Sequence, residues 1–309
     1  MFILSKLDYR ILKRFYKIIY VGSFAVLLLV LFFGSSAKGA TRWVDLGFIS
    51  FQPSEVAKVG IILAYAGYLT EYKDKIKDFK YGFLYPMAGL LPFVVIIYLV
   101  QNHLSATIIV CALAVILVYM AGCKMKYLLG AGIPALGLAV LYVLNKGGFR
   151  VARIFSFMDP WADASGEGWQ IIQSLYAVGS GGIFGVGLGN SKQKYLYLPE
   201  PHNDFIFSVL AEELGFIGCA FVIILFGIFV WRGIVIAMNS KDMFGSLIAM
   251  GITSLIAMEV IINIAVVTAS MPVTGMSLPF FSYGGTALII QLATVGLLLS
   301  ISKTNNKTE

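Results

Sequence analysis

Residues 206–231 read IFSVLAEELGFIGCAFVIILFGIFVW, a stretch whose only charged side chains are Glu212 and Glu213. A helix needs about 20 predominantly apolar residues to cross the hydrocarbon core of a bilayer, and this run is longer than that. Its apolar residues form a block rather than the stripe of a helix that has one face in water. The stretch therefore predicts a transmembrane helix.

The composition of the whole chain supports a membrane protein. Of the 309 residues, 59% are hydrophobic and 13% are charged, whereas soluble proteins have about 45–50% apolar and about 25% charged residues. Further apolar blocks on both sides of the first bring the candidate helices to 15–33, 56–70, 81–100, 104–121, 127–144, 206–231, 244–267 and 285–302. We predict an all-α fold, a polytopic transmembrane helix bundle of about eight spans, as a single membrane domain over residues 1–309.

The span at 56–70 is the weakest, because it is short and contains Lys58. Glu55 lies three residues before Lys58, so the two side chains can pair on one helix face and lower the cost of burying charge. The block at 15–33 is too long for the core of a signal peptide and further spans follow it, so we expect it to be retained. The cysteines lack paired spacing, which argues against disulfides and a zinc site.

Lysine and arginine residues determine the predicted orientation of the helices. With the N-terminus in the cytoplasm, the 23 Lys and Arg residues divide into 15 in cytoplasmic segments, 7 in much longer outer segments, and Lys58 within a span. The net charge of +7 is therefore largely a positive-inside signature and does not indicate nucleic-acid binding. Both termini are expected in the cytoplasm, and the segments 34–55 and 145–204 outside.

The outer segment 145–204 is far longer than an ordinary connection between helices. It is rich in aromatic and aliphatic residues and poor in charge, which argues against disorder and for a functional loop. Trp169, Ile172 and Tyr176 recur in it at helical spacing. This pattern predicts a short helix, which either lies at the depth of the lipid headgroups or simply packs on the protein.

A glycine-rich stretch follows and contains G-x-G-x-G at Gly185, Gly187 and Gly189. It is not a dinucleotide-binding fingerprint, because an outer loop of a membrane protein lacks the required β-α-β context. Two interpretations stay open. Either a tight turn lets backbone amides and the nearby Lys194 approach a phosphate, or the glycines serve close packing.

The loop ends in LPEPHNDFIFSVLAEELG, at residues 198–215, which brings His202, Asp204 and Glu212 to the mouth of the next helix. The dipole of that helix favours an ionised Asp204. Position alone fits both a general base and a helix N-cap. Helical spacing allows only one of Glu212 and Glu213 to face a site shared with Asp204.

Two further polar or irregular stretches accompany this loop. Glu259 and Asn263 are four residues apart in the seventh span and should point into the bundle. Residues 271–285 read MPVTGMSLPFFSYGG, which is non-helical sequence between spans and includes Ser282. Non-helical backbone at membrane depth persists only when it is buried in protein or lines a cavity, so we expect it to wall the same site.

These residues resemble a known family. The strings GATRWVDLGFISFQPSEVAK (39–58), QSLYAVGSGGIFGVGLGNSKQKYLYLPEPHNDFIFSVLAEELG (173–215) and NIAVVTASMPVTGMSLPFFSYGG (263–285) resemble the SEDS group, which comprises the FtsW, RodA and SpoVE proteins of bacteria. The similarity extends in order over nearly the whole chain, and it is closer to the FtsW and SpoVE branches than to RodA.

The resemblance implies a peptidoglycan glycosyltransferase of the bacterial cytoplasmic membrane. Such enzymes polymerise lipid II, the undecaprenyl-pyrophosphate-linked disaccharide peptide, on the outer face, and they work with a single-span class B transpeptidase and with division or sporulation proteins. The family's catalytic aspartate falls in its HxDFIF string, which implies Asp204 here. The arginine and lysine of its RW…QPSExxK segment correspond to Arg42 and Lys58.

The chemistry of chain growth agrees with this assignment. A base must take a proton from a sugar hydroxyl while a lipid pyrophosphate leaves, so cations are needed nearby. Asp204 is the candidate catalytic residue, and no metal-ligand spacing requires a metal, although Mg²⁺ or Mn²⁺ would suit the leaving group. The candidate substrate-binding residues are Arg42, Lys58, Arg153, Lys194, His202, Glu212 and Ser282.

Two departures from the family pattern stand out. Members commonly have ten helices, and the chain resembles them from the segment before their third, so the first two are expected to be missing. In residues 101–107, QNHLSAT, His103 replaces the carboxylate of the family's usual QPDLGT form. Two alternatives to a polymerase stay open, namely a lipid II flippase and a non-catalytic scaffold for a transpeptidase.

Overall fold

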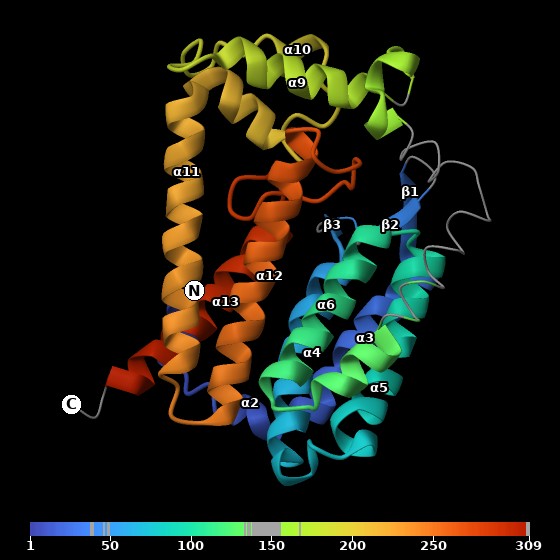
Figure 1. Cartoon of the computed structure of the whole chain (residues 1–309), viewed down its shortest axis with the longest axis vertical. Helices are drawn as coiled ribbons and strands as arrows, with labels where there is room; N and C mark the ends of the chain where they lie inside the picture. The colour runs from blue at the N-terminus through green and yellow to red at the C-terminus, as the bar shows by residue number, and fades with distance from the viewer. Residues whose placement is uncertain are drawn as a thin grey trace. The chain divides into compact units, whose positions relative to one another are not determined.

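The computed structural model describes residues 1–37, 40–45, 47, 50–132, 134, 137, 156–166 and 168–306. The chain forms two compact units. The first unit comprises Met1–Gly132, Val230–Ile256 and Gly285–Glu309, and the second comprises Ile133–Phe229 and Ala257–Gly284. Two long helices, α11 (Ile206–Met238) and α12 (Met243–Val267), each contribute residues to both units (Figure 1).

Within the described ranges, five helices are long and apolar enough to cross a membrane. They are α3 (Tyr16–Phe33), the run Phe79–Val100, α11, α12 and α13 (Gly285–Asn306). The run consists of the π-helical η2 (Phe79–Leu84), then α5 (Tyr85–Val95) and the π-helical η3 (Ile96–Val100). A shorter apolar helix, α6, spans Leu104–Met120. The chain is therefore a multi-pass membrane protein.

Six of the predicted spans are confirmed as helices, namely 15–33, 81–100, 104–121, 206–231, 244–267 and 285–302. Most of the span predicted at 127–144 lies outside the described residues, although 125–132 are helical. The weakest prediction, 56–70, is also a helix, α4 (Pro53–Glu71).

Helix α4 is buried along most of its length in the first unit. It begins at a proline that follows the extended residue Gln52, an arrangement that suits the first turn of a helix. Two glycines permit close contact with α3, because a Cβ at Gly60 would lie 2.3 Å from the Cβ of Ser23 and one at Gly67 would lie 2.3 Å from the Cβ of Tyr16. The low hydropathy of α4 thus reflects protein on its sides rather than lipid.

The N-terminal segment is held by polar contacts within the first unit. It forms the short helices α1 (Phe2–Lys6) and α2 (Ile11–Arg14), and a 3₁₀ turn, η1, covers Lys73–Lys75 further along. The carboxylate of Asp242 accepts hydrogen bonds from Tyr9 Oη (2.6 Å) and Arg10 Nε (3.2 Å). Burial would raise the pKa of Asp242, but these bonds and one from a backbone amide outweigh it and lower that pKa.

A small antiparallel sheet was not predicted. Its strands are β1 (Gly34–Ala37), β2 (Ala40–Asp45) and β3 (Ser50–Phe51), in the order β1-β2-β3. Val44 pairs with Gly34 on one side and Phe51 on the other, and it is buried. The strands are too short and too rich in small polar residues to show the alternation by which strands are recognised.

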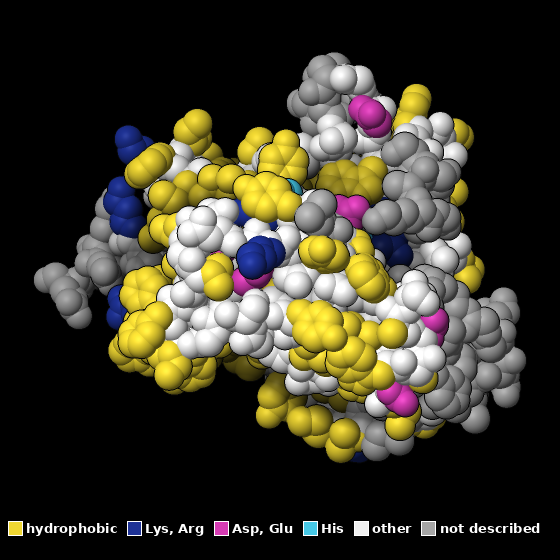
Figure 2. Space-filling model, turned by 90° about the horizontal axis from the view of Figure 1, so that it is seen from above, with side chains coloured by type: hydrophobic (Ala, Val, Ile, Leu, Met, Phe, Trp, Pro, Cys, Tyr) yellow, Lys and Arg dark blue, Asp and Glu magenta, His cyan; other side chains and the backbone are white. Residues whose placement is uncertain are grey.

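In the second unit, the predicted helix of the outer loop is α9 (Trp169–Gly181), preceded by the 3₁₀ turn η4 (Pro160–Asp163) and followed by α10 (Gln193–Leu196). Ile172 of α9 is buried, whereas Tyr176 is exposed and its ring lies 5.8 Å from that of Trp161. Figure 2 looks onto the end where α9 and α10 lie and shows hydrophobic side chains over much of this face. Phe184 and Leu188, in the segment after α9, are 81% and 77% exposed.

The glycine-rich segment after α9 enters the hydrogen-bond ladder of α11. Helix α11 is interrupted at Gly215, whose φ is 65° and ψ is −165°. In a continuous helix the amides of residues 216 and 217 would bond the carbonyls of 212 and 213. Here Phe216 N donates to Gly182 O (2.9 Å) and Ile217 N donates to Ile183 O (3.2 Å).

The two carbonyls released by the interruption are satisfied by the same segment. Val186 N donates to Glu212 O (3.0 Å), and Gly187 N donates to Glu213 O (3.1 Å). The segment 182–187 therefore replaces both missing bonds of the helix. Glycine is required at the crossing, since a Cβ at Gly185 (φ +80°) would lie 2.2 Å from Glu213 O, and one at Gly215 would lie 2.4 Å from Gly185 N.

We predict that Gly185→Ala destabilises the protein strongly, because its left-handed backbone alone should cost about 1–3 kcal/mol and the clash with Glu213 O adds to this. Thermal unfolding in detergent would measure the loss. Gly179→Ala is the matched control, since it lies in α9 with no atom near its Cβ position. Equal melting temperatures for the two variants would contradict the inserted segment.

Candidate active site

Asp204 lies just before α11, and its main chain is held by a buried amide. Asn263 Nδ2 donates to Asp204 O (2.9 Å) and to Met276 O (2.7 Å). Asn263 and Glu259 are both buried, as predicted for the polar face of their helix. Helix α11 begins at Ile206, so Asp204 lies two residues before its first residue. Asp204 is partly exposed.

The non-helical segment 271–285 supports the residues before Asp204. Ser282 Oγ donates to Asn203 O (2.7 Å), and Tyr283 N donates to His202 O (2.8 Å). Ser282 Oγ also accepts from Leu278 N (2.7 Å). These contacts place the segment against the backbone of residues 202 and 203, and its role as a wall of the site stays a prediction. Ser282, a candidate for substrate binding, uses its hydroxyl on the backbone, whereas the side chain of His202 is exposed.

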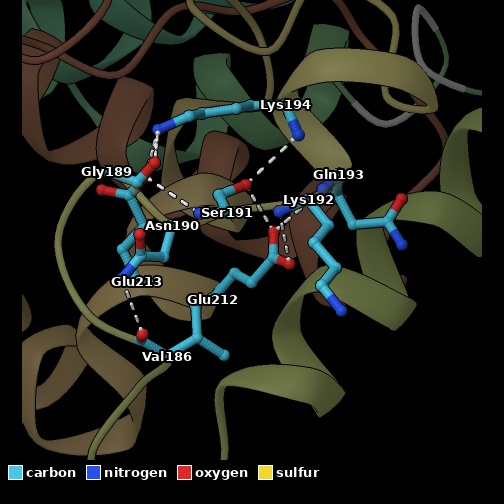
Figure 3. A network of polar contacts seen from close by, with 9 residues as sticks. All are labelled: Val186, Gly189, Asn190, Ser191, Lys192, Gln193, Lys194, Glu212 and Glu213. Carbon is cyan, nitrogen blue, oxygen red and sulfur yellow. Dashed lines mark hydrogen bonds and ion pairs between the residues drawn. The ribbon is translucent and has the colours of Figure 1, made fainter.

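The other candidates in this unit form the polar network of Figure 3. The buried Glu212 carboxylate accepts hydrogen bonds from Ser191 Oγ (2.5 Å), Lys192 N (3.0 Å) and Gln193 N (3.3 Å). Lys194 Nζ lies 2.6 Å from Glu213 Oε1 and donates to Gly189 O (2.9 Å). Both candidates, Glu212 and Lys194, thus bind groups of the protein itself.

The contact with Glu213 also affects the charge of Lys194. The hydrogen bond to that carboxylate raises the pKa of Lys194, against an opposing effect of burial. Lys194 therefore stays protonated at neutral pH, and its charge is balanced by Glu213. Sequence reasoning did not single out Ser191, because an isolated serine after a glycine-rich turn carries no recognisable pattern.

Arg42 and Lys58 lie in the first unit, each beside acceptors of the same unit. Lys58 is fully buried and its Nζ lies 2.8 Å from Glu55 Oε1, which confirms the predicted pair. Arg42 donates from Nε to Gln101 O (3.3 Å) and from Nη2 to Asn102 O (3.0 Å). The side-chain amide of Gln101 is buried without a hydrogen-bond partner among the described residues, and sequence reasoning missed it.

His103 occupies the position where the resembled family has a carboxylate. Its Nδ1 accepts a hydrogen bond from Ala106 N (3.2 Å), so the imidazole caps the start of α6. Burial, reinforced by the positive charges of Arg42 and Lys58, lowers the pKa of His103 to about 3. The ring is therefore neutral at physiological pH, with its proton on Nε2.

Arg153 lies outside the described residues. Within the described part of the chain, no three His, Cys, Asp or Glu side chains gather in a way that could hold a metal ion.

The chain is similar in sequence to a known family of bacterial proteins. The family model of the cell cycle proteins FtsW, RodA and SpoVE matches residues 1–307. A probable peptidoglycan glycosyltransferase FtsW from Geobacter sp. is 44% identical over 96% of this chain and 80% of its own length. The stage V sporulation protein E of Bacillus subtilis is 42% identical over 98% of this chain and 83% of its own length.

Solved structures agree with these sequence relatives. A chain from a peptidoglycan synthase complex that coordinates polymerization and crosslinking has a TM-score of 0.81 and 32% identity, with 99% of this chain and 86% of that chain covered. The rod shape determining protein RodA of Thermus thermophilus has a TM-score of 0.70 and 28% identity, with 99% and 83% covered.

We predict that His103 makes the stability of the protein depend on pH. The unfolded chain protonates a histidine near pH 6.5, whereas the folded protein protonates His103 only near pH 3. The unfolded state thus binds more protons between these values, so stability rises with pH across that window and levels off above it.

The test compares melting temperatures of the wild type and of His103→Asn, which keeps an acceptor at the helix cap. Between about pH 7.5 and about pH 5 the wild type should lose more stability than the variant. Identical losses would mean that His103 titrates as an exposed histidine.

Proposed function

Because the chain belongs to the family of the cell cycle proteins FtsW, RodA and SpoVE, we propose that it is a peptidoglycan glycosyltransferase that polymerises lipid II at the outer face of the bacterial cytoplasmic membrane. Its FtsW relatives are described as probable enzymes of that activity. The observation that carries the proposal for this chain is the partly exposed Asp204, on a backbone held by hydrogen bonds at three consecutive residues.

Asp204 is proposed as the general base. Its carboxylate accepts the proton of an acceptor sugar hydroxyl, and the hydroxyl oxygen forms the new glycosidic bond to the anomeric carbon of the donor sugar. The bond from that carbon to the pyrophosphate oxygen breaks, and the lipid pyrophosphate leaves with the electron pair. A base of this kind typically contributes a factor of about 10²–10⁴ to the rate.

Arg42 and Lys58 are proposed as groups for an anionic part of the substrate. Glu55 pairs with Lys58 across 2.8 Å, and the neutral His103 adds no negative charge beside the two cations. The unbonded amide of Gln101 adds hydrogen-bonding capacity beside Arg42.

The remaining candidate residues fall into two groups, those exposed to solvent and those whose polar atoms bind other groups of the protein. His202 is exposed and is proposed to meet the substrate. Glu212, Lys194 and Ser282 bind protein groups, and we assign them to shaping the site rather than to direct contact. Arg153 stays a candidate from the sequence alone.

A transpeptidase is proposed as the partner, because the similar chain from a peptidoglycan synthase complex belongs to an assembly that joins polymerization to crosslinking. A class B enzyme is what the family resemblance implies, and a role in division or sporulation is proposed because the relatives include FtsW proteins and a stage V sporulation protein. The excess of lysine and arginine in the predicted cytoplasmic segments supports cytoplasmic termini and an outer loop at 145–204.

We predict that Asp204→Asn lowers glycan synthesis from lipid II about 10²–10⁴-fold in the purified complex with its transpeptidase, with unchanged expression and elution from a sizing column. Glu200→Gln is the matched control, because it removes a neighbouring exposed carboxylate and should retain activity. Polymer length and yield on gels provide the measurement.

Full polymer yield from Asp204→Asn would contradict the base assignment. If the wild-type complex made no polymer while lipid II crossed liposome membranes, the chain would be a transporter, for which buried polar groups in helices such as Lys58 and Glu259 would serve as a path. Stimulation of crosslinking without either activity would indicate a scaffold.

A further inference from the structure

The turn at residues 191–193 is fixed to α11 by one side chain. The Glu212 carboxylate receives Ser191 Oγ–H and the backbone amides of Lys192 and Gln193. Glu212 and Ser191 are 3% and 0% exposed. All three groups are donors, so only an acceptor with two free oxygens can satisfy them together.

Glu213 holds the flank of the same turn. Its Oε1 accepts from Lys194 Nζ (2.6 Å) and, more weakly, from Ser191 N (3.4 Å). The main-chain carbonyls of the two glutamates meanwhile bond Val186 N and Gly187 N. Figure 3 shows the side chains of both glutamates directed at the segment 189–194. One site on α11 therefore binds the loop twice, through its backbone at 186–187 and through its side chains at 191–194.

The chain that leaves this turn leads directly to Asp204. On the way, Trp169 Nε1 donates to Tyr197 O (2.9 Å) and Leu198 is buried. At the far end, Asn263 holds the carbonyl of Asp204. The stretch 191–204 is thus a strap with one end fixed by Glu212 and the other by Asn263. Glu212 itself lies eight residues after Asp204, about 12 Å along the helix axis.

We propose that Glu212 is a positioning residue for Asp204: it anchors the start of the strap whose end presents the catalytic carboxylate. The predicted effect on catalysis rests on the proposed function, whereas the anchoring of the strap by Glu212 is independent of that function. The role requires a carboxylate, and glutamate has the length that reaches all three donors. Glutamine would place its NH₂ group against one of these donors. Aspartate would keep both oxygens but withdraw them by one methylene, so it should anchor the turn only in part.

The anchoring is tested by residue-resolved hydrogen exchange of the full chain in nanodiscs. Glu212→Gln should speed exchange at the amides of Lys192 and Gln193 and leave Val186 and Gly187 unchanged, because those two bond main-chain carbonyls. Glu213→Gln is the matched control, which should affect Ser191 N and spare Lys192 and Gln193. Unchanged exchange at Lys192 and Gln193 in Glu212→Gln would overturn the proposal.

The positioning role is tested by steady-state polymerisation of lipid II. Glu212→Gln should lower kcat about tenfold to a hundredfold, as expected for a displaced catalytic group, with KM and the shape of the pH profile largely unchanged. Glu212→Asp should restore part of kcat, which loss of folding would not allow. Ser191→Ala removes one of the three donors to Glu212, together with the acceptor of Lys194 N, and should give a smaller loss in the same direction.

Two results separate this proposal from the proposed function. If Glu212→Gln frees the two amides but keeps full kcat, the strap does not position Asp204 and the inference is wrong. If the wild type makes no polymer, the proposed function fails, and hydrogen exchange alone then decides whether Glu212 anchors the strap. Should Glu212→Gln not fold, Ser191→Ala and Glu212→Asp carry both measurements.

Discussion

The second unit depends on the way a broken membrane helix is repaired. The interruption of α11 at Gly215 redirects the amides of residues 216 and 217 and the carbonyls of residues 212 and 213. In an apolar environment each of these groups would cost several kcal/mol if it were left unsatisfied. The segment 182–187 supplies a partner for all four. The interruption and the glycine-rich loop therefore depend on each other, because the backbone hydrogen bonds of each are completed by groups of the other.

The arrangement of the polar side chains follows from this repair. Residues 212 and 213 stand at the opening, so their side chains reach the segment 189–194 while their carbonyls bond residues 186 and 187. The strap from that segment returns to the start of the same helix at Asp204. In this way the backbone bonds of α11 place Glu212 and Glu213, and the side chains of these two residues in turn hold the segment 189–194.

Much of the fold follows from the sequence, because apolar blocks in a bilayer have few alternatives to helices. The pair of Glu55 and Lys58 and the burial of Asn263 also follow, since charged and amide groups inside a membrane must find partners. Asp204 could be found from its place before a helix, but base and cap were indistinguishable until the family resemblance was considered.

Other features depend on contacts between distant residues and could not be predicted. The run 206–231 is apolar on both sides of Gly215, so its sequence does not reveal an interruption. The interruption becomes evident only from the hydrogen bonds between α11 and residues 182–187. For the same reason the hydrogen bonds from residues 191–193 to the Glu212 carboxylate could not be predicted. The sheet at 34–51 has strands too short to leave a pattern.

The central claim, that residues 182–187 complete the ladder of α11, can be measured directly by hydrogen exchange of the wild-type chain in nanodiscs. The amides of Phe216 and Ile217 should exchange as slowly as those in the middle of α11, and Val186 and Gly187 should be protected with them. Fast exchange at Phe216 and Ile217, with slow exchange only further along the helix, would contradict the account.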